Sequence, residues 1–391
     1  MKMLAYKLDE LKRFNKLKLG EKLQNSGIIS KDQLHEIELK HSPNWYSPGI
    51  ILSIVLALGT FIGSLGVFGL FILGMAQGGE EGISIMGFIC FIISFASLEF
   101  YFVSDKKHFR SGVSEALIVQ GIFSLFGAIF IIEEPHEIVG IFIVAALFLF
   151  CAIRYNSILS FLIGLGSSTA LVVVILNTLG GFWSSLIPFI SLTIWIGGYS
   201  LSLRIEKNHS LWPWHELSQW LKGYSMVLIY LSVNYYVVRE LSAEMLGFRV
   251  PQGEDIPLAM IFYTLTILIP IGYLYIAINK RDYLFLRIGL VAAIFSAITF
   301  KIYYSTGHPE ISLTLGGLVL MALGYSVMKY YKEPKNGITI VPLYANDWLE
   351  SEMEAFVVGQ TLGGNEPIEP SETPIEFGDG EFGGGGAGGS F

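Results

Sequence analysis

Long apolar stretches separated by short polar intervals occupy the chain between residues 49 and 331. A helix that crosses the hydrocarbon core of a bilayer needs about 20 mostly apolar residues. Inside lipid, each segment must satisfy its own backbone N–H and C=O groups, so we interpret these stretches as transmembrane helices. The pattern predicts ten spans, over residues 50–74, 83–103, 113–132, 138–153, 157–178, 183–203, 223–238, 257–279, 283–304 and 310–331.

The polar ends of the chain divide it into three parts. Residues 1–47 are predicted to form a cytoplasmic helical hairpin, and residues 48–331 a transmembrane bundle of about ten helices. Residues 332–391 are predicted to be an acidic, glycine-rich cytoplasmic tail that is largely disordered. The expected fold class is therefore all-α, a polytopic transmembrane helical bundle.

The distribution of basic residues predicts the orientation of this bundle. Lys and Arg accumulate in the short cytoplasmic loops of membrane proteins. Nine of them precede the first span, and the later ones recur in every second loop. With ten spans, only Arg239, Arg249 and Lys301 fall on the outer side, and Arg287 lies within a span. We therefore expect a multi-pass protein of the cell inner (plasma) membrane with both termini in the cytoplasm.

Composition and motifs argue against several functional classes. Hydrophobic residues make up 52% of the 391 residues, above the roughly 45–50% apolar content of soluble domains. The sequence has no HExxH zinc motif, no GxSxG nucleophile elbow and no phosphate-binding loop. It also has no basic stripe for nucleic acid. We expect no enzymatic activity, no cofactor, no bound metal and no nucleic-acid partner, and we expect the lipid bilayer as a partner.

The N-terminal segment combines helical periodicity with a helix-start signal. Ser30 is followed by Gln33, which is the spacing of a capping box at the start of a second helix. Three interpretations remain open: a docking module, a surface for anionic lipid headgroups, or an orientation signal that packs on the cytoplasmic loops. The apolar positions of the first helix are Leu8, Leu11, Phe14 and Leu17.

The segment Gly27-Ile-Ile-Ser-Lys-Asp-Gln33, followed by a helical turn and many spans, resembles a group of bacterial multi-span membrane-protein families. These families begin with a short cytoplasmic helical hairpin and have no established activity. The resemblance covers residues 10–75. It implies a bacterial membrane location and carries over no function.

The tail beyond Lys335 has ten acidic residues and no Lys or Arg. It is interpreted either as a flexible solvated tail or as an acidic segment that binds a basic partner. Residues 1–47 and 336–391 are therefore the regions from which we expect a cytoplasmic or membrane protein partner to be recruited.

Few ionisable or amide side chains lie inside the predicted spans, and such residues are candidate functional sites by default. Glu99, Glu115 and Arg287 lie about one helical turn in from the inner interface, and Gln120 lies deeper. One interpretation joins the three charges into a gate or proton site. The other makes them snorkelling side chains or a structural ion pair.

Two further patterns concern helix packing. Gly59, Gly63 and Gly66 in the first span form a small-residue pattern that lets another helix approach closely, or marks an unwound binding segment. In the loop before span seven, an apolar face predicts an amphipathic helix lying flat in the headgroup layer. That face consists of Leu211, Trp214, Leu217 and Leu221.

Two functional hypotheses follow from these patterns. The first is a non-enzymatic scaffold or regulator that recruits partners through its cytoplasmic ends. The alternative is a transporter of a small uncharged or amphipathic molecule. The absence of a carboxylate near the middle of the spans argues against ion-coupled transport, and the first hypothesis is slightly favoured.

Overall fold

The computed structural model describes residues 4–25, 28–75, 78–132, 137–246 and 255–303, together with isolated positions between 317 and 329. Within these residues the fold is all-α, without β-strands. The elements in chain order are α1 (Leu8–Asn25), α2 (Lys31–His41), α3 (Ile50–Met75), α4 (Gly79–Ala96), η2 (Ser97–Asp105), α5 (Val113–Ile132), α6 (Glu137–Tyr155), α7 (Ile158–Leu179), α8 (Gly181–Ser185), α9 (Ile187–Lys207), η3 (His209–Trp214), α10 (His215–Val233), α11 (Tyr235–Leu246), α12 (Ala259–Lys280) and α13 (Tyr283–Tyr303).

Seven helices of the described chain are long and apolar enough to cross a membrane, which makes this a multi-pass membrane protein. They are α3, the continuous helix formed by α4 and η2, α5, α6, α7, α12 and α13. Each coincides with one of the predicted spans. Predicted span ten, over residues 310–331, and the predicted tail lie outside the continuously described residues.

Predicted spans six and seven fall on interrupted helices. Span six begins in the short α8 and continues in α9. Span seven contains the junction of α10 and α11, where Asn234 has an extended backbone and ends α10. The Asn234 side chain is fully buried, donates to the Tyr230 hydroxyl at 2.8 Å and also contacts Thr299 at 3.2 Å. These hydrogen bonds pair the polar side chain at the helix interruption, which would otherwise be costly to bury in an apolar setting.

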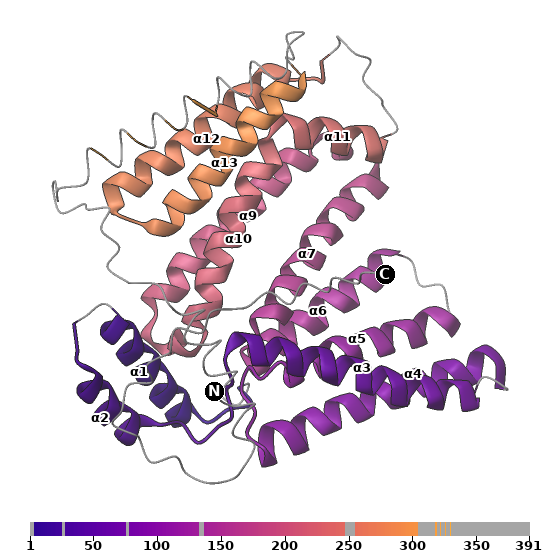
Figure 1. Ribbon diagram of the computed structural model, residues 1–391. Helices are drawn as coiled ribbons and strands as arrows, with labels where there is room; N and C mark the ends of the chain where they lie inside the picture. The colour runs from indigo at the N-terminus through magenta and orange to yellow at the C-terminus, as the bar shows by residue number, and fades with distance from the viewer. Residues whose placement is uncertain are drawn as a thin grey trace, which may run out of the picture.

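The helices form two groups (Figure 1). We call α3–α6 with η2 the first group, and α9, α10, α12 and α13 the second group. Helix α7 lies between them, and the hairpin of α1 and α2 lies beside the end at which the two groups meet.

Glycines allow close helix packing within the first group and beside it. A Cβ atom at Gly87 of α4 would lie 2.8 Å from the Ala128 side chain of α5. A Cβ atom at Gly164 of α7 would lie 2.9 Å from Leu149 of α6. Small residues at helix contacts are the usual means of close approach in membrane proteins. The α4–α5 and α6–α7 pairs are therefore held by direct backbone proximity.

The segment before span seven differs from the predicted interfacial helix. Leu217 and Leu221 are buried within the protein, and the Trp214 indole donates to the Ile153 carbonyl at 3.0 Å. Helix α10 runs without interruption from His215 to Val233. The apolar face found in the sequence therefore packs on neighbouring helices and not on lipid headgroups.

Candidate functional site: a cytoplasmic junction of the hairpin and both helical groups

An aromatic cluster holds α1 and the chain after α2 against the first group. Phe109, from the loop between η2 and α5, is fully buried at its centre. Its ring contacts Trp45 with a centroid distance of 4.4 Å, Tyr6 at 4.9 Å and Phe14 at 5.2 Å. Edge-to-face and offset contacts of this kind add to the stabilisation from apolar burial. We call Tyr6, Phe14, Trp45 and Phe109 the aromatic anchor.

Hydrogen bonds to backbone carbonyls strengthen the same contact. The Tyr6 hydroxyl donates to the His108 carbonyl at 3.1 Å, and the Ala5 amide donates to the Arg154 carbonyl at 2.9 Å. Tyr46 forms an isolated β-bridge with His108. Burial, followed by the nearby Glu115 carboxylate, raises the pKa of Tyr6 far above its usual value. The Tyr6 phenol therefore stays a neutral hydrogen-bond donor.

The loop that receives α1 depends on a glycine. Gly112 has a φ of +83°, and a Cβ atom there would lie 1.8 Å from the Ser53 carbonyl oxygen of α3. Only glycine combines this left-handed conformation with so close a backbone approach. The Ser53 hydroxyl also donates to the Arg110 carbonyl at 3.3 Å. The loop is thus seated directly on the start of α3.

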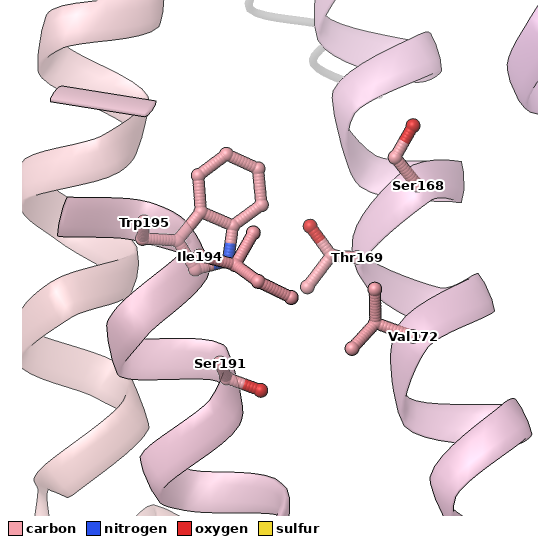
Figure 2. A pocket seen from close by; sticks show the side chains of 6 residues that line it. All are labelled: Ser168, Thr169, Val172, Ser191, Ile194 and Trp195. Carbon is pink, nitrogen blue, oxygen red and sulfur yellow. The ribbon is translucent and has the colours of Figure 1, made fainter. Parts of the chain in front are cut away.

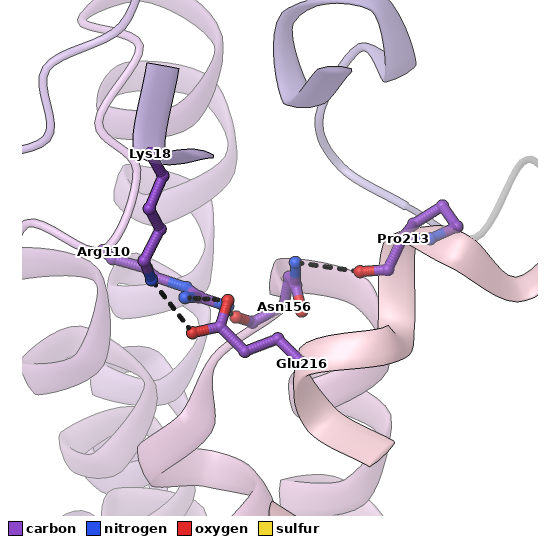
Figure 3. Close-up of polar contacts among 5 residues, drawn as sticks. All are labelled: Lys18, Arg110, Asn156, Pro213 and Glu216. Carbon is purple, nitrogen blue, oxygen red and sulfur yellow. Dashed lines mark hydrogen bonds and ion pairs between the residues drawn. The ribbon is translucent and has the colours of Figure 1, made fainter. Parts of the chain in front are cut away.

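One carboxylate joins the hairpin, the first group and the second group (Figure 3). Glu216, on the first turn of α10, accepts from Arg110 Nη1 at 2.7 Å through Oε2. Its Oε1 accepts from Lys18 Nζ of α1 at 3.4 Å. Arg110 also donates from Nε to the Asn156 carbonyl at 3.2 Å, and Asn156 donates to the Pro213 carbonyl at 3.2 Å. We call these five residues the junction network.

Charge controls the protonation of Glu216. Burial alone would raise the pKa of this carboxyl group, but the Arg110 guanidinium and the Lys18 ammonium outweigh it and hold the pKa below its usual range. Glu216 is therefore ionised at neutral pH. Charge-assisted hydrogen bonds to an ionised carboxylate are stronger than neutral ones.

Helix α2 has a different environment from α1. It begins with the expected capping box, in which Ser30 and Gln33 exchange hydrogen bonds. None of its residues is buried, and Leu39 is 74% exposed. Its contact with α1 is formed at Gly20, where Leu34 and Ile37 pack closely. The other side of α2 faces outward, with the charged side chains of Glu36 and Lys40 forming only an exposed ion pair.

The predicted polar residue Glu99 lies in the π-helix η2 and has its partners in α6. Its carboxylate pairs with the Arg154 guanidinium and accepts a hydrogen bond from the Tyr155 hydroxyl at 2.7 Å. Because π-helical segments are rare and redirect side chains, η2 places Glu99 where a regular helix would not. The ion-pair interpretation of Glu99 thus has a specific partner, and that partner is not Arg287.

The other predicted polar residues are not gathered into one site. Glu115 accepts from the Gly112 amide at 3.0 Å and so caps the start of its own helix. Gln120 accepts from the Ser64 hydroxyl of α3, and its buried Nε2 has no hydrogen-bond partner among the described residues. Arg287 is exposed on α13 in the second group and forms no ion pair with a described residue.

The glycines of the first span face open space. A Cβ atom at Gly59, Gly63 or Gly66 would meet no described atom within 4 Å. The close helix contact predicted from these glycines therefore stays a prediction.

Sequence reasoning missed the junction network and the aromatic anchor. Lys18 and Glu216 are 198 residues apart, and each alone is an ordinary charge on a helix surface. The aromatic residues Trp45 and Phe109 flank spans, a position that is equally typical of interfacial side chains. The one feature of the sequence that pointed to this contact was the apolar face of the first helix, which indicates packing against another part of the protein.

Comparisons with protein-family models, with curated proteins and with solved structures find no match for this chain. Among the described residues, no three His, Cys, Asp or Glu side chains are grouped so that they can hold a metal ion. The geometry of the junction is therefore the main guide to function.

Proposed function

We propose that this protein is an inner-membrane scaffold or regulator that presents its cytoplasmic hairpin to a protein partner. The observation that carries the proposal is the contrast within the hairpin. Helix α1 is held by the aromatic anchor and by Lys18, whereas α2 has no buried residue. A helix that is held in place but left uncovered is available for binding, and binding loses less entropy when the presenting element is already fixed.

The membrane arrangement belongs to the same proposal. The positive-inside distribution supports ten spans with both ends of the chain in the cytoplasm. The hairpin, the Lys106–Lys107 loop and the start of α10 then share one side of the membrane. Their mutual contacts through Tyr46 and Glu216 support this placement.

Transport of a small neutral molecule is the alternative function. Cargo and ligand sites usually have volumes of about 300–1,000 Å³. The cavity between α7 and α9 measures about 80 Å³, too little for a whole cargo molecule. This cavity therefore gives no support to transport of a whole molecule, whereas the contrast between α1 and α2 supports the scaffold or regulator.

Site-specific photo-crosslinking in native membranes tests the proposal. A photoreactive amino acid replaces Leu39 on α2, and the matched control position is Leu19 on α1, which is also exposed (74% and 56%, respectively). We expect a discrete protein adduct from position 39 and none from position 19. The same experiment on a truncated protein that ends at Lys335 shows whether the acidic tail contributes.

Two further results decide the outcome. The adduct at position 39 should decrease when Leu11→Ala and Glu216→Gln together release α1, because α2 is then no longer held in place. Equal adducts at positions 19 and 39, or no protein adduct at either, would contradict the proposal.

A further inference from the structure

A small cavity lies between α7 and α9, away from the cytoplasmic junction (Figure 2). It has a volume of about 80 Å³. Thr169 is near the middle of α7, and the lining residues of α9 are in its first half. None of the lining side chains carries a charge. The cavity is lined by Ser168, Thr169, Val172, Ser191, Ile194 and Trp195.

The polar side chains on the α7 wall are already hydrogen-bonded. Ser168 donates to the Gly164 carbonyl at 2.7 Å, and Thr169 donates to the Leu165 carbonyl at 2.8 Å. The Thr169 hydroxyl also contacts the Tyr224 hydroxyl of α10 at 3.0 Å. Both hydroxyl hydrogens of this wall are therefore used, so it can offer a ligand only acceptor oxygens.

The α9 wall differs, because its polar groups have no hydrogen-bond partner among the described residues. The Trp195 side chain is largely buried, with an exposed fraction of 6%, and within the described chain its indole N–H makes no hydrogen bond. The Ser191 hydroxyl, one turn earlier on α9, also has none there. Figure 2 shows the Trp195 ring projecting from α9 toward α7, with the indole nitrogen at the edge of the ring beside Ile194. An unpaired donor on a largely buried side chain is costly.

Packing fixes the direction of this donor. The Trp195 ring meets the Tyr224 ring edge-on, with a centroid distance of 5.0 Å. On its other side is Gly198, where an added Cβ atom would lie 3.3 Å from the indole and 2.8 Å from Ser225 Oγ. The N–H therefore cannot rotate toward another acceptor without moving α9 or α10. A donor held in place beside an empty space is the arrangement of a binding site.

We propose that this cavity binds the acceptor oxygen, a carbonyl or hydroxyl, of a neutral amphipathic molecule that enters from the bilayer. The Trp195 N–H would donate to that oxygen, and the Ser191 hydroxyl would supply a second contact. Uncharged walls favour a neutral ligand, because nothing in the cavity would compensate a charge. Ile194 forms part of the wall and is 41% exposed, so one side of the site faces the surroundings of the helices.

The size of the cavity limits which part of the ligand it holds. One water molecule occupies about 30 Å³ in the liquid, so this volume accepts only a few heavy atoms. The oxygen-bearing head would fit inside, and the hydrocarbon chain would remain among the lipid tails. The competing occupant is a small group of water molecules, and the test must separate the two.

Photolabelling of the full-length protein in nanodiscs of neutral lipid tests the site. The probe is a long-chain methyl ketone that carries a diazirine, and the control probe has the same chain and diazirine without the carbonyl. Labelled peptides are mapped by mass spectrometry. We expect the ketone to label the segments around residues 168–172 and 191–195 about fivefold more than the control probe, which corresponds to one hydrogen bond. Unlabelled long-chain ketone or alcohol should compete.

Variants make the assignment specific. Trp195→Phe keeps an aromatic ring but removes the N–H and should reduce ketone labelling to the level of the control probe. Val172→Phe fills the space and should do the same. Trp183→Phe, the same change at an exposed tryptophan on α8, should leave labelling unchanged. Size-exclusion elution and circular dichroism check that each variant is folded. If Trp195→Phe does not fold, Ser191→Ala takes its place. Its expected loss of ketone labelling is about twofold to threefold.

Equal labelling by the ketone and the control probe would show that the cavity holds water or lipid chains, and would overturn the proposal. So would ketone labelling that Trp195→Phe, or in its place Ser191→Ala, leaves unchanged.

Discussion

The two helices of the cytoplasmic hairpin are both rich in charged residues, but their surroundings are opposite. Helix α1 buries Leu11, with an exposed fraction of 2%, and sends Lys18 to a carboxylate of α10. Helix α2 buries no residue, and its ion pairs with described residues are all exposed, so they contribute little. The difference indicates a division of labour: α1 attaches the hairpin to both helical groups, and α2 is left available. The variants below test this contrast in order of decreasing effect.

The largest effect is expected from Gly112→Ala. The added Cβ atom would overlap the Ser53 carbonyl, and alanine disfavours the left-handed backbone. The loop under α1 would have to move, at a cost of at least about 3 kcal/mol in stability. Thermal unfolding of the protein in detergent should show a large decrease in midpoint. Gly127→Ala in α5, where a Cβ atom meets no described atom within 4 Å, is the control and should stay within about 1 kcal/mol of the parent.

Leu11→Ala should release α1 from the first group. Removing a buried leucine side chain costs about 2–4 kcal/mol, and here the loss is concentrated on the contact of the hairpin. Limited proteolysis should then cleave within residues 8–25 many times faster than in the parent. Leu39→Ala on α2 removes the same side chain from an exposed position and should leave the cleavage rate unchanged. Equal sensitivity of both variants would show that α1 is not anchored.

Glu216→Gln should weaken the junction network by about 1–2 kcal/mol, because Arg110 and Lys18 lose the negative charge with which they pair. The same contacts predict a pH dependence. The pKa of Glu216 in the folded protein is below its usual value, so its stabilisation is fully present above a pH of about 5. It is lost as the pH falls through the usual value toward the lowered one.

Protease protection of α1, measured from neutral pH down to a pH of about 3.5, checks this dependence. The parent protein should lose protease protection of α1 at the acidic end. The difference in protection between the parent and Glu216→Gln should become smaller there. A difference that stays constant over the whole range would show that the Glu216 charge does not hold the junction.

The smallest effect is expected from Lys18→Met. The Lys18 side chain is partly exposed and its contact distance of 3.4 Å is long, so the pair contributes about 0.5 kcal/mol or less. The Arg110 contact remains in this variant. Its loss of protection should be small at low salt and disappear at high salt, because screening weakens exposed pairs. A loss as large as that of Glu216→Gln would mean that Lys18, and not Arg110, is the main partner.

The sequence predicted the helical architecture well where a single physical requirement acts. Apolar length identified the seven helices that can cross a membrane, and the Ser30–Gln33 spacing identified the start of α2. The sequence could not predict which of several possible neighbours a side chain contacts. Periodicity gives the depth of Glu99 but not the side of the bundle it faces, so the sequence grouped Glu99 with Arg287 and did not identify Arg154 as its partner. The apolar face around Trp214 looks the same whether lipid or protein covers it.

The junction itself was beyond sequence reasoning for a related reason. It requires Arg110 and Gly112 in left-handed backbone conformations, and it joins residues from three distant segments. Nothing in a single sequence links such positions. The aromatic residues of the anchor were visible individually, but their common contact with Phe109 depends on the path of the loop between η2 and α5.

Attachment of α1 to α10, with α2 left uncovered, is tested most directly by cysteine chemistry in native membranes. Lys18→Cys and Glu216→Cys are joined by a short bismaleimide, and Leu39→Cys is probed with a soluble maleimide. We predict efficient cross-linking of the pair and rapid modification at position 39. Failure of the pair to cross-link, or protection of position 39 equal to that of position 18, would contradict this arrangement.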